Sequence, residues 1–225
     1  MPTPIDSQLS EVLDQMIPNQ AFAAVVRVGA ASIRADTRDQ MIVGDWALAR
    51  QQEYLAGRWC AREAMAQAGL VDGAALRADP DGLPQWPKGV LGSITHSKGL
   101  CAAAVGAEGE LVLLGLDLER TDRIGTAAMK RVIHSAESGF AGESQINASI
   151  LFSLKEAFYK AQYPKWRTSG NFHDLALDVN LEQGSAEVRE ISPQFAADLV
   201  RSASELRFRF GLFGDYVVSL CWLPR

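Results

Sequence analysis

The sequence contains only three cysteines, Cys60, Cys101 and Cys221, and they are widely spaced. It has no Cys-x-x-Cys pair and no cysteine–histidine cluster at the spacing of zinc ligands, which argues against a structural zinc site. The simplest interpretation is three reduced, buried thiols in a cytoplasmic protein.

Long apolar runs and an excess of basic charge are also missing. No run approaches the roughly 20 apolar residues that a bilayer span needs, and residues 1–16 lack the basic and apolar regions of a signal peptide. We therefore expect no membrane span. Acidic residues outnumber basic ones by 27 to 22, a formal net charge of −5. This balance argues against nucleic acid as a partner, although it leaves room for a local basic pocket.

The rest of the composition is typical of a folded protein, with 48% hydrophobic and 22% charged residues among 225. Hydrophobic patterning predicts strands and helices in a repeating order. The predicted elements are a strand at 22–28, a helix at 45–68 capped by Asp45, two strands within 89–106 that turn at Lys98-Gly99, a strand at 111–119, a helix at 149–163 stopped by Pro164, and a terminal hairpin that turns at Gly214-Asp215. Each half thus has a long helix followed by a strand hairpin. This order indicates two similar α/β lobes, with a cleft where a ligand can bind.

Two acidic residues alternate along the predicted strand at 111–119. Successive side chains on a strand point to opposite faces, so Asp117 and Glu119 share one face. Adjacent carboxylates repel each other unless a cation lies between them, and Mg²⁺ prefers such oxygen ligands. A solvated acidic face at a strand end is the alternative interpretation.

In the predicted helix at 149–163, Glu156 and Lys160 are four residues apart and therefore lie on one face. One interpretation is an exposed ion pair. The other makes Glu156 a third carboxylate for the metal and Lys160 a cation for a phosphate group.

Further polar residues suit an anionic ligand. His96, with Thr95 and Ser97 beside it at a strand end, is suited to phosphate or ribose contacts, and a structural histidine is the alternative. Arg50 and Arg58 lie about 80° apart around the first predicted helix. Their guanidinium groups could hold phosphates in a bidentate manner, or they could pair with neighbouring glutamates.

Three sequence blocks occur in one order, namely GSITHS at 92–97, GLDLER at 115–120 and FSLKEAFYK at 152–160. Together they resemble the signature blocks of the 4′-phosphopantetheinyl transferases of the Sfp/EntD type, most closely the siderophore-synthase branch. A helix block at 53–62 and a Trp-Pro loop at 82–87 are similar to that branch as well. The resemblance spans roughly residues 45–175.

The resemblance implies an α+β fold of two lobes, residues 1–110 and 111–225, related by a pseudo-two-fold axis within a monomer. The active site would lie in the cleft between them. The implied reaction transfers the phosphopantetheine arm from coenzyme A to a serine of an apo acyl, peptidyl or aryl carrier protein. Mg²⁺ would be the cofactor and 3′,5′-ADP the by-product. The implied pathways are siderophore, non-ribosomal peptide or fatty-acid synthesis.

The resemblance also implies roles for individual residues. The expected Mg²⁺ ligands are Asp117, Glu119 and Glu156. The residues expected to contact coenzyme A are Arg50, Arg58, Thr95, His96 and Lys160. The expected catalytic residues are Glu156, Lys160 and Glu137, with Glu156 or Glu137 as the base that takes the serine proton. Arg62 is expected to form a structural pair.

The sequence departs from the family pattern at a few positions. Thr95 and Ala157 replace residues that are serine in many members, and Leu83 replaces a lysine that reaches coenzyme A in several. The spacing after Pro164 also differs, which leaves the pantetheine contacts unassigned. Two other functions are considered, a non-catalytic subunit that binds coenzyme A or a carrier protein, and a Mg²⁺-dependent phosphohydrolase that uses the same carboxylates.

Overall fold

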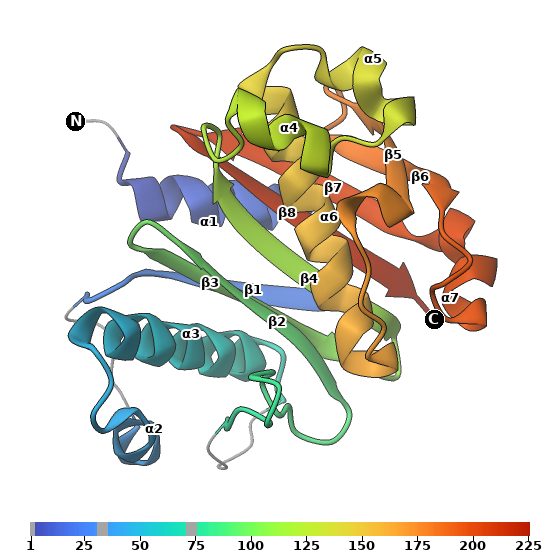
Figure 1. Ribbon diagram of the computed structural model, residues 1–225. Coiled ribbons are helices and arrows are strands. Elements are labelled where there is room, and N and C mark those ends of the chain that lie inside the picture. The colour runs from blue at the N-terminus through green and yellow to red at the C-terminus, as the bar shows by residue number, and fades with distance from the viewer. Residues whose placement is uncertain (1–2, 31–35, 71–75) are drawn as a thin grey trace.

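The computed structural model describes residues 3–30, 36–70 and 76–225, which form two antiparallel sheets with a long helix packed on each (Figure 1). The N-terminal sheet has the strand order β1-β3-β2 and is covered by α3. The elements of this half are α1 (Ile5–Met16), β1 (Ala21–Arg27), α2 (Thr37–Val43), α3 (Leu48–Gln67), β2 (Val90–Ser97) and β3 (Leu100–Ala107).

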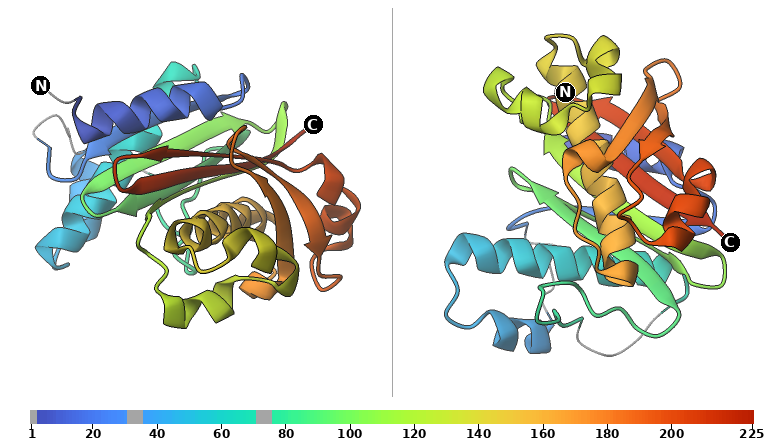
Figure 2. Two further views of the ribbon diagram at one scale, coloured as in Figure 1. Left: turned by 90° about the horizontal axis from the view of Figure 1, so that it is seen from above. Right: turned by 45° about the vertical axis from the view of Figure 1, so that its right-hand side comes forward.

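The C-terminal sheet has the strand order β4-β8-β7-β6-β5 and curves around α6 (Figure 2). Leu151, Leu154 and Phe158 of α6 are buried against it, as their helical spacing predicts. With η denoting a 3₁₀ helix, the elements are β4 (Leu111–Arg120), α4 (Thr126–Val132), η1 (Ser135–Glu137), α5 (Ser138–Ala141), α6 (Gln145–Trp166), η2 (Phe172–Asp174), β5 (Leu175–Asn180), β6 (Ser185–Ile191), α7 (Ala197–Arg201), η3 (Ala203–Glu205), β7 (Arg207–Phe213) and β8 (Tyr216–Pro224).

The two halves meet where β2 packs against β4, the edge strand of the C-terminal sheet. Side-chain hydroxyls make the link, because Ser93 Oγ accepts from Leu116 N at 3.0 Å and Thr95 Oγ1 accepts from Leu118 N at 3.1 Å. These bonds satisfy buried amides of the edge strand. The matched order of the partners shows that β2 and β4 run in the same direction and end together.

The predicted α+β class is confirmed, as are the strands expected at 22–28, within 89–106 and at 111–119. The hairpin between β2 and β3 turns at Lys98 and Gly99, which have φ values of 43° and 85°. Two consecutive positive φ angles are what a tight hairpin turn requires. The three cysteines are buried and unpaired, as expected.

The predicted N-cap of the first long helix is wrong. Helix α3 begins at Leu48 after the N-cap residue Ala47, and no side chain caps it. The amide of Trp46 donates to Val43 O at 2.8 Å. This turn after α2 separates Asp45 from the start of α3.

The predicted end of the second long helix is also wrong. Helix α6 continues through Pro164 to Trp166, and Arg167 N donates to Tyr163 O at 2.9 Å to close its last turn. A proline lacks the N–H of a normal helical hydrogen bond. Because Pro164 lies in the last turn, few bonds remain beyond it to be disturbed.

Helix α1 and strands β5 and β6 were not predicted. The buried residues of α1 are Leu9, Leu13 and Met16, and their spacing is a helical signal that could have identified it. Only Ala186 of strand β6 is buried, so the strand lacks the clear apolar alternation of a half-buried strand. No helix in the described part of the chain is long and apolar enough to cross a membrane.

Candidate active site

A cavity of about 410 Å³ lies between the two halves at the ends of β2 and β4, with α6 along one side. It brings together residues from all three sequence blocks. Its lining residues are Ile94, Thr95, His96, Asp117, Glu119, Arg123, Phe152, Glu156 and Lys160.

Asp117 and Lys160 make the closest polar contact in this cavity. Lys160 Nζ donates to Asp117 Oδ1 at 2.6 Å and to Thr95 Oγ1 at 3.2 Å. The Thr95 hydroxyl also accepts from Leu118 N and is buried. Thr95 lines the cavity while its hydroxyl also joins the two halves, and its role as a coenzyme A contact stays a prediction.

The other two acids are less tightly held and titrate abnormally. The pKa of Glu119 is raised to about 7, first by burial and then by the charge of Asp117. The same causes raise the pKa of Glu156. Arg123 and Lys160 lower both values but do not cancel the effect. The cavity is thus a place where additional positive charge is favoured.

The chemistry of these acids fits Mg²⁺. Asp117 Oδ2 is buried and has no hydrogen-bond partner among the described residues, an arrangement that a hard cation would satisfy. Within residues 3–30, 36–70 and 76–225, no three His, Cys, Asp or Glu side chains already converge to hold a metal ion. The side chains of the three acids would therefore have to rotate toward one another when Mg²⁺ binds.

A second cavity, of about 360 Å³, adjoins the first and shares Ile94 and His96 with it. The predicted anion-binding residues Arg50, Arg58 and His96 all line it. Its other lining residues are Trp46, Glu53, Tyr54, Gly57, Ala78, Gly82 and Pro84.

The three predicted anion contacts differ in how they are held. Arg50 is half-exposed and lies 3.5 Å from Glu53. Arg58 is buried, and its Nε donates to Leu76 O at 2.6 Å. His96 Nδ1 lies 3.7 Å from Glu53 Oε1, and burial is the largest cause that lowers its pKa. Arg50 and His96 are therefore the residues best able to reorient toward a ligand.

Glu137 does not lie in the cavity, which corrects its assignment as a catalytic residue. Its side chain is fully buried, and Lys155 Nζ donates to its Oε2 at 2.7 Å. Its carboxylate also accepts from the amides of His134 and Leu177, each at 2.8 Å. A carboxylate with this many protein donors holds segments together and is not available as a base. The expected structural pairing of Arg62 is confirmed, with Asp39 as its partner.

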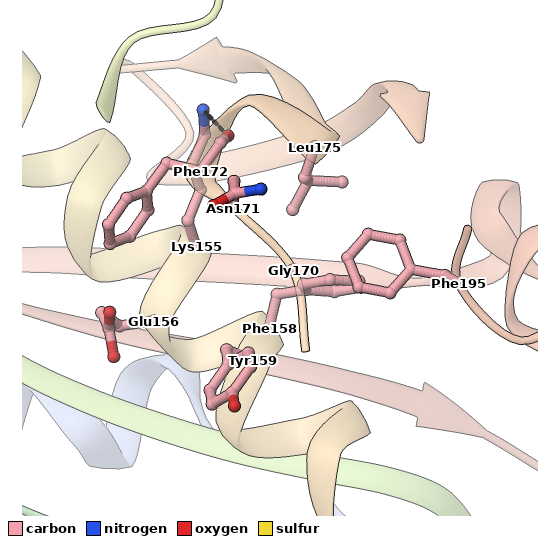
Figure 3. A pocket seen from close by; sticks show the side chains of 9 residues that line it. All are labelled: Lys155, Glu156, Phe158, Tyr159, Gly170, Asn171, Phe172, Leu175 and Phe195. Carbon is pink, nitrogen blue, oxygen red and sulfur yellow. Dashed lines mark hydrogen bonds between the residues drawn. The ribbon is translucent and has the colours of Figure 1, made fainter. Parts of the chain in front are cut away.

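A third, more apolar pocket of about 280 Å³ borders the first cavity, with Glu156 belonging to both (Figure 3). Its wall includes the segment at 170–172, and Lys155 Nζ donates to Phe172 O at 2.8 Å. The remaining side chains in this wall are mainly aromatic or aliphatic, namely Phe158, Tyr159, Leu175 and Phe195.

Beside the aliphatic Ile94, two lining residues of the first cavity, Arg123 and Phe152, were not predicted as site residues. The Nε of Arg123 lies 3.5 Å from Glu119 Oε2, and its guanidinium lies 5.4 Å from the ring centre of Phe152. Arg123 lies in the turn that follows the second block. A turn has no regular period, so the sequence does not indicate the direction of its side chain. Phe152 begins the third block, but an aromatic residue at helical spacing usually belongs to the hydrophobic core.

Two family descriptions match consecutive parts of the chain. Residues 39–106 match the 4′-phosphopantetheinyl transferase N-terminal domain, and residues 113–221 match the 4′-phosphopantetheinyl transferase superfamily. With both halves matched in order, the chain belongs to the Sfp-type 4′-phosphopantetheinyl transferases, a family of enzymes that generally use coenzyme A and Mg²⁺.

Three curated relatives are similar in sequence. The transferase Svp of Streptomyces mobaraensis is 32% identical over 64% of this chain and 61% of its own length. Npt of Nocardia iowensis is 26% identical over 78% of this chain and 80% of its own length. PptT of Mycobacterium tuberculosis is 33% identical over 57% of this chain and 58% of its own length. The match thus spans less than two thirds of the length of Svp and PptT.

Solved structures of holo-[acyl-carrier-protein] synthases also match about half of the chain. The enzyme from Thermotoga maritima has a TM-score of 0.41 and 17% identity, over 51% of this chain and 65% of its own. The enzyme from Neisseria meningitidis has a TM-score of 0.40 and 19% identity, over 51% of this chain and 98% of its own.

Proposed function

We propose that this protein transfers the 4′-phosphopantetheine group from coenzyme A to a serine of an apo carrier protein and releases 3′,5′-ADP. The observation that supports this proposal is the pair of adjoining cavities, which share Ile94 and His96. One presents Arg50, Arg58 and His96, and the other presents three acids with Lys160. Coenzyme A has a matching sequence of groups, with a nucleotide 3′-phosphate followed by a pyrophosphate.

In this reaction the serine oxygen attacks the phosphorus that carries the pantetheine arm, and the bond from that phosphorus to 3′,5′-ADP breaks. Asp117, Glu119 and Glu156 would hold Mg²⁺, which supplies charge neutralisation on the pyrophosphate. Lys160 lies in the same cavity and would stabilise negative charge on the phosphate oxygens. The rate enhancement would come mainly from the alignment of the reacting groups by these residues, and less from covalent catalysis.

The serine proton needs an acceptor within the cavity. Glu156 suits this role, because its carboxylate lines the cavity in which the serine would meet the pyrophosphate. Glu137 is buried in its pair with Lys155 and does not line the cavity. We therefore assign Glu156 as the base.

The third pocket would receive the pantetheine arm. The arm is uncharged and partly apolar, and the pocket beside Glu156 is lined by Phe158, Tyr159 and Phe195. The same pocket is also lined by Gly170, Asn171 and Phe172, which lie in the segment after Pro164 whose pantetheine contacts the sequence left unassigned.

The carrier itself would serve siderophore, non-ribosomal peptide or fatty-acid synthesis, and the siderophore branch is favoured by the sequence blocks. We propose a monomer, as the family resemblance implies. Its lobes would be residues 1–110 and 111–225, which act as one unit because the cavity is built from both.

The test is incubation of the purified protein with coenzyme A, Mg²⁺ and a panel of apo carrier proteins. We expect the mass of a carrier to increase by one phosphopantetheine, and EDTA to prevent the increase. A folded protein that modifies no carrier would refute the proposal. Tight coenzyme A binding without release of 3′,5′-ADP would support a binding subunit instead, and cleavage of coenzyme A without a carrier would support a phosphohydrolase.

A further inference from the structure

The loop at 76–85 forms one wall of the second cavity through Ala78, Gly82 and Pro84. Its chain folds back on itself, with an isolated β-bridge between Ala78 and Pro84. Asp79 N donates to Leu83 O at 2.8 Å, which closes the turn. The loop therefore has a base near residues 76–78 and a tip near residues 79–82.

The base of the loop is held from its own half of the protein. Arg58 of α3 is buried, and its Nε donates to Leu76 O at 2.6 Å. Tyr54 of the same helix donates through its hydroxyl to the same carbonyl at 3.5 Å. Both bonds end on the Leu76 carbonyl at the base of the loop, so they do not restrain the tip.

The tip is held from the other half, by a single arginine. Arg167 Nη2 lies 2.8 Å from Asp79 Oδ2, and Arg167 Nη1 lies 2.7 Å from Asp81 Oδ2. The other oxygen of Asp79 accepts from the amides of Asp81 and Leu83, each at 2.9 Å. The fork of one guanidinium thus fixes two carboxylates, and one of these organises the turn itself.

The position of Arg167 depends on how α6 ends. The helix passes through Pro164, and Arg167 is its C-cap in the left-handed conformation with φ 54°. Its guanidinium lies 5.7 Å from the ring centre of Tyr163 on the last helical turn. The helix that carries Glu156 and Lys160 therefore also carries the residue that reaches the wall of the second cavity.

We propose that Arg167 is a positioning residue for the nucleotide part of coenzyme A, which it serves by holding the tip of the 76–85 loop. This inference rests on the function proposed above, because the second cavity would hold the nucleotide. Arg167 does not line either cavity. Its effect should therefore appear in ligand affinity and not in the chemical step.

The first test measures backbone hydrogen exchange of residues 76–85 without any ligand. Arg167→Ala should accelerate exchange at the tip, because the ion pairs that restrain it are lost. Arg201→Ala is the matched control, since Arg201 pairs with Asp198 on the distant helix α7 and does not contact the loop. Unchanged exchange in Arg167→Ala would overturn the proposal whatever the protein catalyses.

The second test measures 3′,5′-ADP binding by calorimetry and transfer kinetics. Arg167→Ala should raise the Kd for 3′,5′-ADP and the KM for coenzyme A about fivefold, the scale of a partly exposed ion pair. The kcat should be unchanged, and Arg167→Lys should restore part of the affinity because one bond can re-form.

The two tests separate the possible failures. Faster exchange with an unchanged Kd would overturn the positioning role while leaving the proposed function intact. A fall in kcat with an unchanged Kd would do the same, since it would place Arg167 in the chemical step. A wild-type protein that modifies no carrier and binds no 3′,5′-ADP would overturn the proposed function and this role together.

Discussion

The side-chain ammonium of Lys160 lies 2.6 Å from Oδ1 of Asp117, and this contact joins α6 to β4 inside the cavity. The same ammonium lies 3.2 Å from the hydroxyl of Thr95 on β2. One lysine therefore connects the three elements that build the site. In the proposed reaction it is also the cation closest to the acids that would hold Mg²⁺.

Replacing Lys160 by methionine should lower kcat for carrier modification by about 100-fold, the usual effect of removing one donor to a developing oxyanion. Affinity for Mg²⁺, measured by calorimetry, should not weaken, because the three acids remain. Lys165→Met is the matched control, because Lys165 is exposed on the same helix and does not line the cavity. A parallel loss of Mg²⁺ affinity and kcat would mean that Lys160 orders the acids and does not act on the phosphate.

Glu119 should make stability depend on pH in the absence of divalent cations. Its folded-state pKa is raised from 4.5 to about 7, so the folded protein retains a proton that the unfolded chain has already released. Its contribution therefore becomes destabilising as pH rises from about 4.5 to about 7, and it is absent at lower pH. Because the group is partly exposed, solvent screening reduces this cost to about 2 kcal/mol.

Urea unfolding in EDTA at pH 5 and pH 8 tests this expectation. Glu119→Gln should be more stable than the wild type at pH 8 and should lose most of that advantage at pH 5. Adding Mg²⁺ should stabilise the wild type more at pH 8 than at pH 5. A stability difference that is the same at both pH values would contradict the assigned titration.

The buried pair of Lys155 and Glu137 should be required for stability. Either Lys155→Met or Glu137→Gln would leave one buried partner without its counterpart, at a cost of about 3 kcal/mol or more in the free energy of unfolding. The double variant should lose less than the sum of the two single variants, since neither unpaired charge remains. Folded Glu137→Gln protein should keep a near-normal kcat. A kcat that collapses in fully folded protein would restore Glu137 as a catalytic candidate.

Gly115 should be essential for the packing of β4 on α6. A Cβ at this position would clash with Ala157 O and would lie 2.6 Å from Ala161 N, which are backbone atoms of a helix and cannot move aside alone. Gly115→Ala should therefore destabilise the protein by about 3 kcal/mol and separate Asp117 from Lys160 in whatever folds. Gly139→Ala is the control, because a Cβ there meets nothing within 4 Å. Thermal unfolding with equal effects at the two glycines would refute this explanation.

Local patterning alone was sufficient for much of the site. The two-residue period of a strand places Asp117 and Glu119 on one side of β4, and the helical period places Glu156 and Lys160 on one side of α6. The order of the three blocks then indicated the family. These inferences succeed because each depends on residues close together in sequence, where backbone geometry decides the direction of a side chain.

Only the tertiary structure decided which polar residues face the cavity. The family resemblance made Glu137 a candidate base, but the fold buries it against Lys155, 18 positions away. Arg123 has no local pattern, but the turn after β4 brings it to the acids. Arg167 reaches Asp79, 88 positions away, because α6 continues past Pro164. Such contacts depend on how elements distant in sequence pack, and no local period records that packing.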